Sequence, residues 1–81
     1  MRDNQTKTLY LTVDKKDSSF IYFTLESNEG LAFYSTLQHK EGAQERTIEL
    51  TYHLSLEKEV MSTLEHLKRN INLEIKALPE A

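Results

Sequence analysis

The sequence predicts a small α+β domain whose strands and helices follow one another in the order β-α-β-β-α-β. Apolar residues alternate along about 7–13, and they take a helical spacing from there to Gly30. They alternate again along about 31–38 and 46–54, take a helical spacing once more, and end in a short alternating stretch. This is the split βαβ order. The 81 residues suit one domain, which we expect to span 1–81 with an ordered core at about 7–78.

The first half of the chain reads as a strand, a helix and a turn. Along about 7–13 the odd positions, from Leu9 to Val13, are apolar and define the buried face of a strand. Asp14, Asp17 or Ser18 is expected to cap a helix that runs to about 29. Gly30 then suits the positive φ that often ends a helix. The expected buried stripe of this helix consists of Phe20, Ile21, Thr24 and Leu25.

The second half reads as a hairpin, a helix and a last strand. Strands at about 31–38 and 46–54 flank a polar loop, 39–45, and the last strand covers about 72–78. Ser55 is expected to cap the second helix. The expected core positions of the third strand and this helix are Ile48, Leu50, Tyr52, Leu54, Val60, Leu64, Leu67 and Ile71.

Right-handed crossovers arrange these elements as a ferredoxin-like sandwich, with four antiparallel strands in order 4-1-3-2 and both helices on one face. Antiparallel sheets often leave the other face to water. The alternative is a partner or dimer surface, on which Tyr10 and Tyr34 would be the anchors, and the exposed edge of the second strand is a further place for dimerisation. The side chains expected on the open face are Thr8, Tyr10, Thr12, Tyr34, Thr36, Thr47, Glu49, Thr51, His53, Glu74 and Lys76.

Composition argues against several classes of function. The chain has no cysteine, and its histidines (His39, His53 and His66) lack the spacing of metal ligands, so we expect no metal and no cofactor. No activated nucleophile stands out, and we predict no catalytic residue and no enzyme. The net charge of −3, and Glu49 on a strand without paired aromatic residues, argue against nucleic acid. Without a signal peptide or a long apolar stretch, we expect a cytoplasmic protein that binds no membrane.

One end of the predicted fold gathers positive charge. The turns expected there hold six basic and four acidic residues, and the first helix starts at the same end. Unpaired N–H groups at a helix N-terminus favour anions. Lys15 and Lys16, with the backbone of Asp17 and Ser18, are therefore candidates to bind a small anion, whereas ordinary solvated turns are the simpler interpretation.

Two carboxylates break a local rule. Glu26 and Glu29 stand in the last turn of the first helix, where negative charge opposes the helix dipole. Such residues are candidates for function. The simpler expectation is that Lys7 or Lys76, at the same end of the fold, or water neutralises them.

The same stretch carries a resemblance. Leu25-Glu26-Ser27-Asn28-Glu29-Gly30-Leu31-Ala32, followed by Thr36-Leu37, resembles the signature of a family of small uncharacterised bacterial proteins, classed as a domain of unknown function. The likeness extends over about 9–73 and implies a bacterial, cytoplasmic protein with no assigned activity. Its signature residues are Glu26, Ser27, Glu29 and Gly30; Gly30 also suits the turn.

The predicted plan is also similar to that of ACT domains, regulatory modules that bind amino acids between paired subunits. The usual glycine of their first turn is missing, because 14–18 reads Asp-Lys-Lys-Asp-Ser. The sequence therefore favours a non-enzymatic regulatory or protein-interaction module that forms a homodimer. The alternative is an ACT-like sensor of a small anionic metabolite or amino acid at Lys15, Lys16, Asp17 and Ser18.

Overall fold

A computed structural model describes residues 5–37 and 41–77 and confirms the predicted order of elements. His39 and Lys40, in the expected hairpin loop, lie outside the described residues, as does the expected end of the last strand at position 78. Short 3-10 turns, η1 and η2, precede the two α-helices. The elements are β1 (Thr6–Asp14), η1 (Lys15–Asp17), α1 (Ser18–Ser27), β2 (Phe33–Thr36), β3 (Glu45–His53), η2 (Leu54–Leu56), α2 (Glu57–Asn70) and β4 (Leu73–Ala77).

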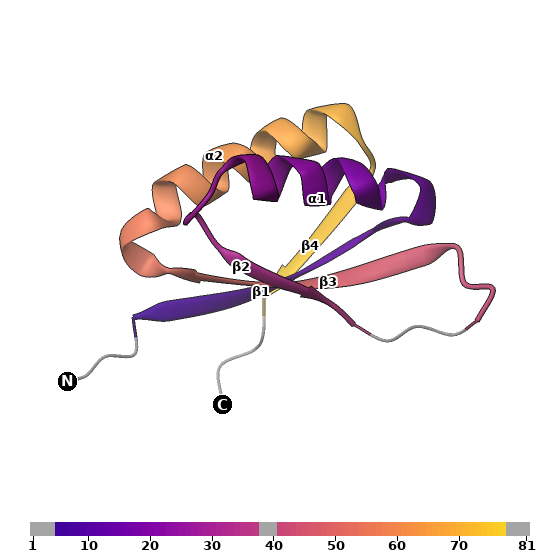
Figure 1. Ribbon diagram of the computed structural model, residues 1–81, viewed down its shortest axis with the longest axis horizontal. Helices are drawn as coiled ribbons and strands as arrows, with labels where there is room; N and C mark the ends of the chain where they lie inside the picture. The colour runs from indigo at the N-terminus through magenta and orange to yellow at the C-terminus, as the bar shows by residue number, and fades with distance from the viewer. Residues whose placement is uncertain (1–4, 38–40, 78–81) are drawn as a thin grey trace.

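The four strands form one antiparallel sheet in the order β2-β3-β1-β4, which confirms the predicted topology. β1 and β3 pair along their whole length, from Thr6 opposite His53 to Asp14 opposite Glu45. Both helices cover the same face of the sheet, and none of the described helices or strands covers the opposite face (Figure 1). The fold is therefore an α+β sandwich of the ferredoxin-like kind.

The core lies between the helices and the covered face of the sheet. Alternate residues of β1 and β3 meet the i, i+4 stripes of both helices there, as the hydrophobic spacing predicts. Burying each such side chain contributes about 1.5–3 kcal/mol relative to exposure. The buried residues are Leu9, Leu11, Val13, Ile21, Leu25, Ile48, Leu50, Tyr52, Val60, Leu64 and Leu67.

The helix-to-strand turn after α1 behaves largely as predicted. Gly30 has φ +83°, which confirms the expected left-handed residue. Hydrogen bonds close the last turn, because Ser27 Oγ and Asn28 Nδ2 donate to the carbonyls of Phe23 and Thr24. The helix ends at Ser27, two residues earlier than expected.

Of the predicted helix caps only Asp17 has the expected position, and none makes the expected side-chain capping bond. Asp17 stands at the N-cap of α1 without a side-chain capping bond, and Ser18 Oγ donates to the carbonyl of Lys15. At the other junction β3 ends at His53, whose Nδ1 accepts from the N–H of Ser55 at 3.1 Å. This 3-10 turn delays α2 to Glu57 and turns Leu54, an expected core residue, outward to 40% exposure.

The predicted faces of β2 are also wrong. Tyr34 lies opposite Leu50 and Thr36 opposite Ile48, and both partners are core residues. Because residues paired across a sheet share a face, Tyr34 and Thr36 lie on the helix-covered face. The open face instead receives Phe33 and Ser35.

Candidate functional site

The edge of the sheet formed by β2 has unpaired backbone groups. Among the described strands β2 pairs with β3 alone, and the N–H of Leu37, just beyond it, donates to the carbonyl of Thr47 at 2.9 Å. In an antiparallel ladder alternate residues direct both backbone groups to the same neighbour. The N–H and C=O groups of Tyr34 and Thr36 therefore point away from the sheet, and the edge expected from the sequence is open.

An aromatic cluster ties this edge to α1 on the helix-covered side. The rings of Tyr22 and Tyr34 stack with their centroids 5.4 Å apart. Tyr34 Oη donates to Glu26 Oε2 at 2.5 Å, and the hydroxyls of Tyr22 and Thr36 are hydrogen-bonded to each other. The hydrogen bond to Glu26, followed by partial burial, raises the pKa of Tyr34. The cluster holds β2 in place while leaving its outer backbone groups free.

This cluster explains one of the two rule-breaking carboxylates. The expected neutralisation of Glu26 and Glu29 by lysine is wrong, because Lys7 Nζ lies 3.8 Å from Glu57 and Lys76 Nζ lies 3.8 Å from Glu74. Glu26 instead accepts the hydroxyl proton of Tyr34. Glu29 is exposed beyond the end of the helix.

On the open face the strongest apolar feature is Phe33, whose side chain is 82% exposed. It borders a shallow cavity of about 230 Å³ together with Tyr34, Ser35, Glu49 and Thr51. Phe33 was not among the expected interface residues. Alternation in the sequence points away from it, because the shared parity of the apolar residues Leu31, Phe33 and Leu37 predicts that Phe33 is buried and Tyr34 exposed.

Tyr10 lies on the open face, as expected, between Glu49 of β3 and Lys76 of β4. Its Oη donates to Glu49 Oε2 at 3.1 Å. Partial burial, followed by this bond, raises the pKa of Tyr10. Next to it Thr8 and Thr51 are joined through their hydroxyls at 3.0 Å. The middle of the face is therefore an ordered polar surface around one aromatic ring.

The candidate anion site at the start of α1 is only partly assembled. Lys15 and Lys16 line a cavity of about 410 Å³ with Asp14 and Gln44. The charge of Lys16 is shared, since its Nζ lies 3.5 Å from Asp17 and 3.9 Å from Asp14. The structure thus brings the two lysines together, but it places carboxylates beside them.

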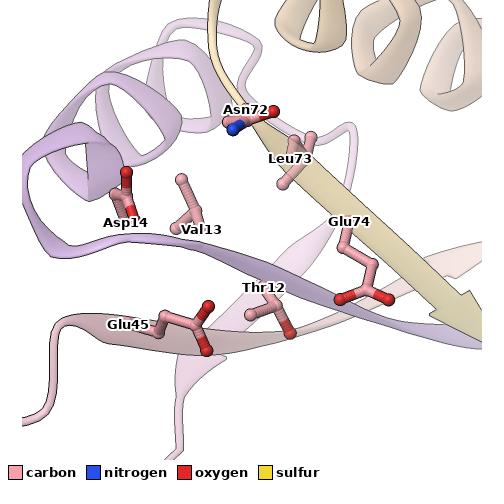
Figure 2. Close-up of a pocket in the computed structure, with 7 residues that line it drawn as sticks. All are labelled: Thr12, Val13, Asp14, Glu45, Asn72, Leu73 and Glu74. Atoms are coloured by element: carbon pink, nitrogen blue, oxygen red, sulfur yellow. The ribbon is translucent and has the colours of Figure 1, made fainter.

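A second hollow at the same end of the molecule is acidic. Figure 2 shows carboxylates from three strands around it, and its volume is about 240 Å³. This end is therefore less positive than the charge of its turns indicates. In residues 5–37 and 41–77, no group of three acidic or histidine side chains is placed to hold a metal ion. The lining residues are Thr12, Val13, Asp14, Glu45, Asn72, Leu73 and Glu74.

Comparison with known proteins identifies the family. A family model described as a domain of unknown function, DUF4911, matches residues 11–71, which is more than half of the chain. The chain belongs to the DUF4911 family. The resemblance to an uncharacterised family is thus confirmed at this level. No curated protein matches this DUF4911 chain.

A solved structure has a similar fold. It is described as a DUF3240 family protein from Shewanella baltica OS155. The DUF4911 chain is 16% identical to it, with a TM-score of 0.64, and the match covers 98% of this chain and 96% of that one. At this identity the likeness concerns the fold alone. None of the described helices of the DUF4911 chain has the length and apolar character needed to cross a membrane.

Proposed function

We propose that this DUF4911 protein is a small non-enzymatic interaction module that works as a homodimer, in which β2 of one copy pairs antiparallel with β2 of the other. The observation that carries the proposal is the open edge of β2, whose outward backbone groups at Tyr34 and Thr36 lie beside the exposed ring of Phe33. Open strand edges pair readily with another strand.

The strand is self-complementary in one register. With Ser35 on the two-fold axis, Tyr34 of one copy stands opposite Thr36 of the other, and the pair exchanges both of its backbone hydrogen bonds. Because the axis generates that pair twice, all four outward groups of each β2 are satisfied. The same register places Phe33 beside Leu37 of the second copy, on the open face.

Covering Phe33 supplies a driving force. Its ring is 82% exposed in the single chain, and full burial of a phenylalanine side chain contributes about 1.5–3 kcal/mol. The dimer contains this contact twice. The tyrosine cluster supports the arrangement, because Tyr22 and Glu26 hold Tyr34 in the orientation that the register needs.

A disulfide trap tests this register directly. In antiparallel pairs without mutual hydrogen bonds the Cα atoms lie about 4.5 Å apart. This is within the disulfide range of about 4.4–6.8 Å. Since the chain has no cysteine, Ser35→Cys introduces a single thiol on the axis. We expect it to give a disulfide-linked dimer under mild oxidation, with sedimentation equilibrium showing a dimer of the unmodified protein.

Ser62→Cys is the matched control, since Ser62 is exposed on α2, in the helix layer and not on the strand edge. It is expected to cross-link far more slowly at the same concentration. Equal rates for the two variants, or a monomer at high protein concentration, would contradict the dimer.

A second function is favoured by the lysine-lined cavity at Lys15 and Lys16. There the module would act as a sensor of a small anionic metabolite or amino acid, next to Asp17 and Ser18. Amide NMR titration with amino acids, nucleotides and inorganic phosphate tests it. Saturable shifts confined to 14–20, lost in the Lys15→Ala, Lys16→Ala double variant, would support the sensor, whereas a flat response would oppose it.

A further inference from the structure

The charges of the molecule are divided unequally between its two layers. The open face of the sheet carries three carboxylates on β3 and β4 and one ammonium group, that of Lys76. Helix α2, on the opposite side, carries three residues of each sign. On β3 and β4 these carboxylates belong to Glu45, Glu49 and Glu74, and Asp14, opposite Glu45, stands at the end of β1.

Aromatic side chains accompany these carboxylates. Tyr10 lies at the middle of the face with Glu49 and Lys76 as its cross-strand neighbours. Phe33 lies toward the β2 side, across from Thr51. Lys76 pairs with Glu74 at 3.8 Å, so the carboxylates of the face still outnumber its ammonium group. Aromatic anchors on a surface of net negative charge favour a partner of complementary charge.

The net negative charge of the open face distinguishes between the kinds of partner that could bind there. A second copy docked face to face would bring its own carboxylates against these, and like charges in contact are unfavourable. Nucleic acid would be repelled for the same reason, since its affinity depends on cationic contacts to phosphates. A cationic protein segment meets no such penalty.

We propose that the open face of the sheet is a docking surface for a basic protein segment, in which lysine or arginine side chains contact Glu45, Glu49 and Glu74 and an apolar residue packs on Tyr10. This goes beyond the β2 dimer and does not depend on it, because every residue named here lies within one chain. In the dimer the two open faces lie on the same side of one continuous sheet, so the surface is doubled.

Amide NMR titration with a defined peptide tests the proposal. The probe is a synthetic peptide in which four lysines and intervening serines flank one phenylalanine, and its counterpart has glutamate in place of lysine. We expect saturable shifts confined to β1, β3 and β4 with the lysine peptide, weakening as salt is added. Shifts confined to the helices, or equal binding of the glutamate peptide, would overturn the proposal.

Charge-matched variants separate a specific face from net charge. The test variant carries Glu45→Gln, Glu49→Gln and Glu74→Gln, which keep the side-chain size and an acceptor for Tyr10. Three exposed ion pairs at about 0.5 kcal/mol each correspond to about tenfold weaker binding.

The control variant removes the same number of charges elsewhere, at exposed positions in or next to the helices: Glu29→Gln, Glu59→Gln and Glu65→Gln. It is expected to bind the lysine peptide within about twofold of the unmodified protein, because these side chains are outside the face. Equal weakening by both variants would show that the peptide responds to overall charge alone and would refute the proposal. Binding of a short DNA duplex to the open face would refute it as well.

Discussion

Tyr52→Phe should change how the stability of the protein depends on alkaline pH. The Tyr52 side chain is 1% exposed, and its Oη donates to Glu57 Oε2 at 3.0 Å. Burial, followed by the hydrogen bond to this carboxylate, raises the pKa of Tyr52 to about 12 from its usual value of 10.0. Phenylalanine keeps the ring in the core and removes the ionisable hydroxyl.

The magnitude follows from proton linkage. The unfolded chain loses the Tyr52 proton near pH 10.0, while the folded protein holds it to about pH 12. The raised pKa therefore contributes stability that is fully present below pH 10 and is lost as the pH rises toward 12. The loss is about 1.4 kcal/mol at pH 11 and approaches about 2.7 kcal/mol above pH 12, at 1.36 kcal/mol per pKa unit.

The variant lacks this alkaline loss of stability. At pH 8 the lost hydrogen bond lowers its free energy of unfolding by about 1 kcal/mol relative to the unmodified protein. Since phenylalanine does not titrate, this difference should shrink above pH 10 and vanish near pH 11.

Urea unfolding followed by far-ultraviolet circular dichroism at pH 8, 9, 10 and 11 measures both curves. A second variant, Glu57→Gln, keeps an acceptor oxygen but removes the charge, so it should reduce the alkaline loss without abolishing it. A difference between Tyr52→Phe and the unmodified protein that stays constant from pH 8 to pH 11 would refute the reasoning, because it would mean that Tyr52 ionises alike in both states.

Three further experiments test the edge of the sheet and its supports. Tyr34→Phe and Glu26→Gln should each lower the urea midpoint slightly, and the double variant should fall no further than the larger single effect, whereas additive effects would contradict the hydrogen bond. Gly30→Ala should cost about 1–2 kcal/mol of unfolding free energy from its φ of +83° alone, since a Cβ there meets no atom within 4 Å, and Gly30→Asn should cost less. Thr36→Pro removes an outward N–H and should give a monomer in sedimentation, while Thr36→Val, which keeps the N–H, should remain a dimer; dimerisation of the proline variant would disprove the edge pairing.

The arrangement of elements could be predicted from the sequence because it depends on periodicity. Alternation in β1 and β3, and the helical spacing of Val60, Leu64 and Leu67, are properties of the core, and the core determines which elements pack together. The chirality of crossovers then leaves few strand orders to choose from. These steps need no knowledge of individual side-chain contacts.

The candidate site was harder to predict because it depends on which face of the sheet each β2 residue occupies and on which side chains pair with one another. Leu31 and Ala32 precede β2, which has only four residues, so the alternation gave too few positions to decide between Tyr34 and Phe33. Similarly, the number of charges expected at one end of the fold could not show that Lys7 pairs with Glu57, or that a tyrosine hydroxyl donates a hydrogen bond to Glu26. These pairings, and the faces of β2, are determined by contacts between elements that are far apart in the sequence.

The position of β1 between β3 and β4 has a consequence for the folding rate. The first strand hydrogen-bonds to the two strands farthest from it in the sequence, and the linked hydroxyls of Thr8 and Thr51 are 43 residues apart. The centre of the sheet can therefore form only after the two ends of a long loop have met. The entropy lost in closing that loop raises the free energy of the folding transition state. We expect folding over milliseconds to seconds, slower than in helical bundles of this size, with β1 protected from hydrogen exchange only once β3 has docked.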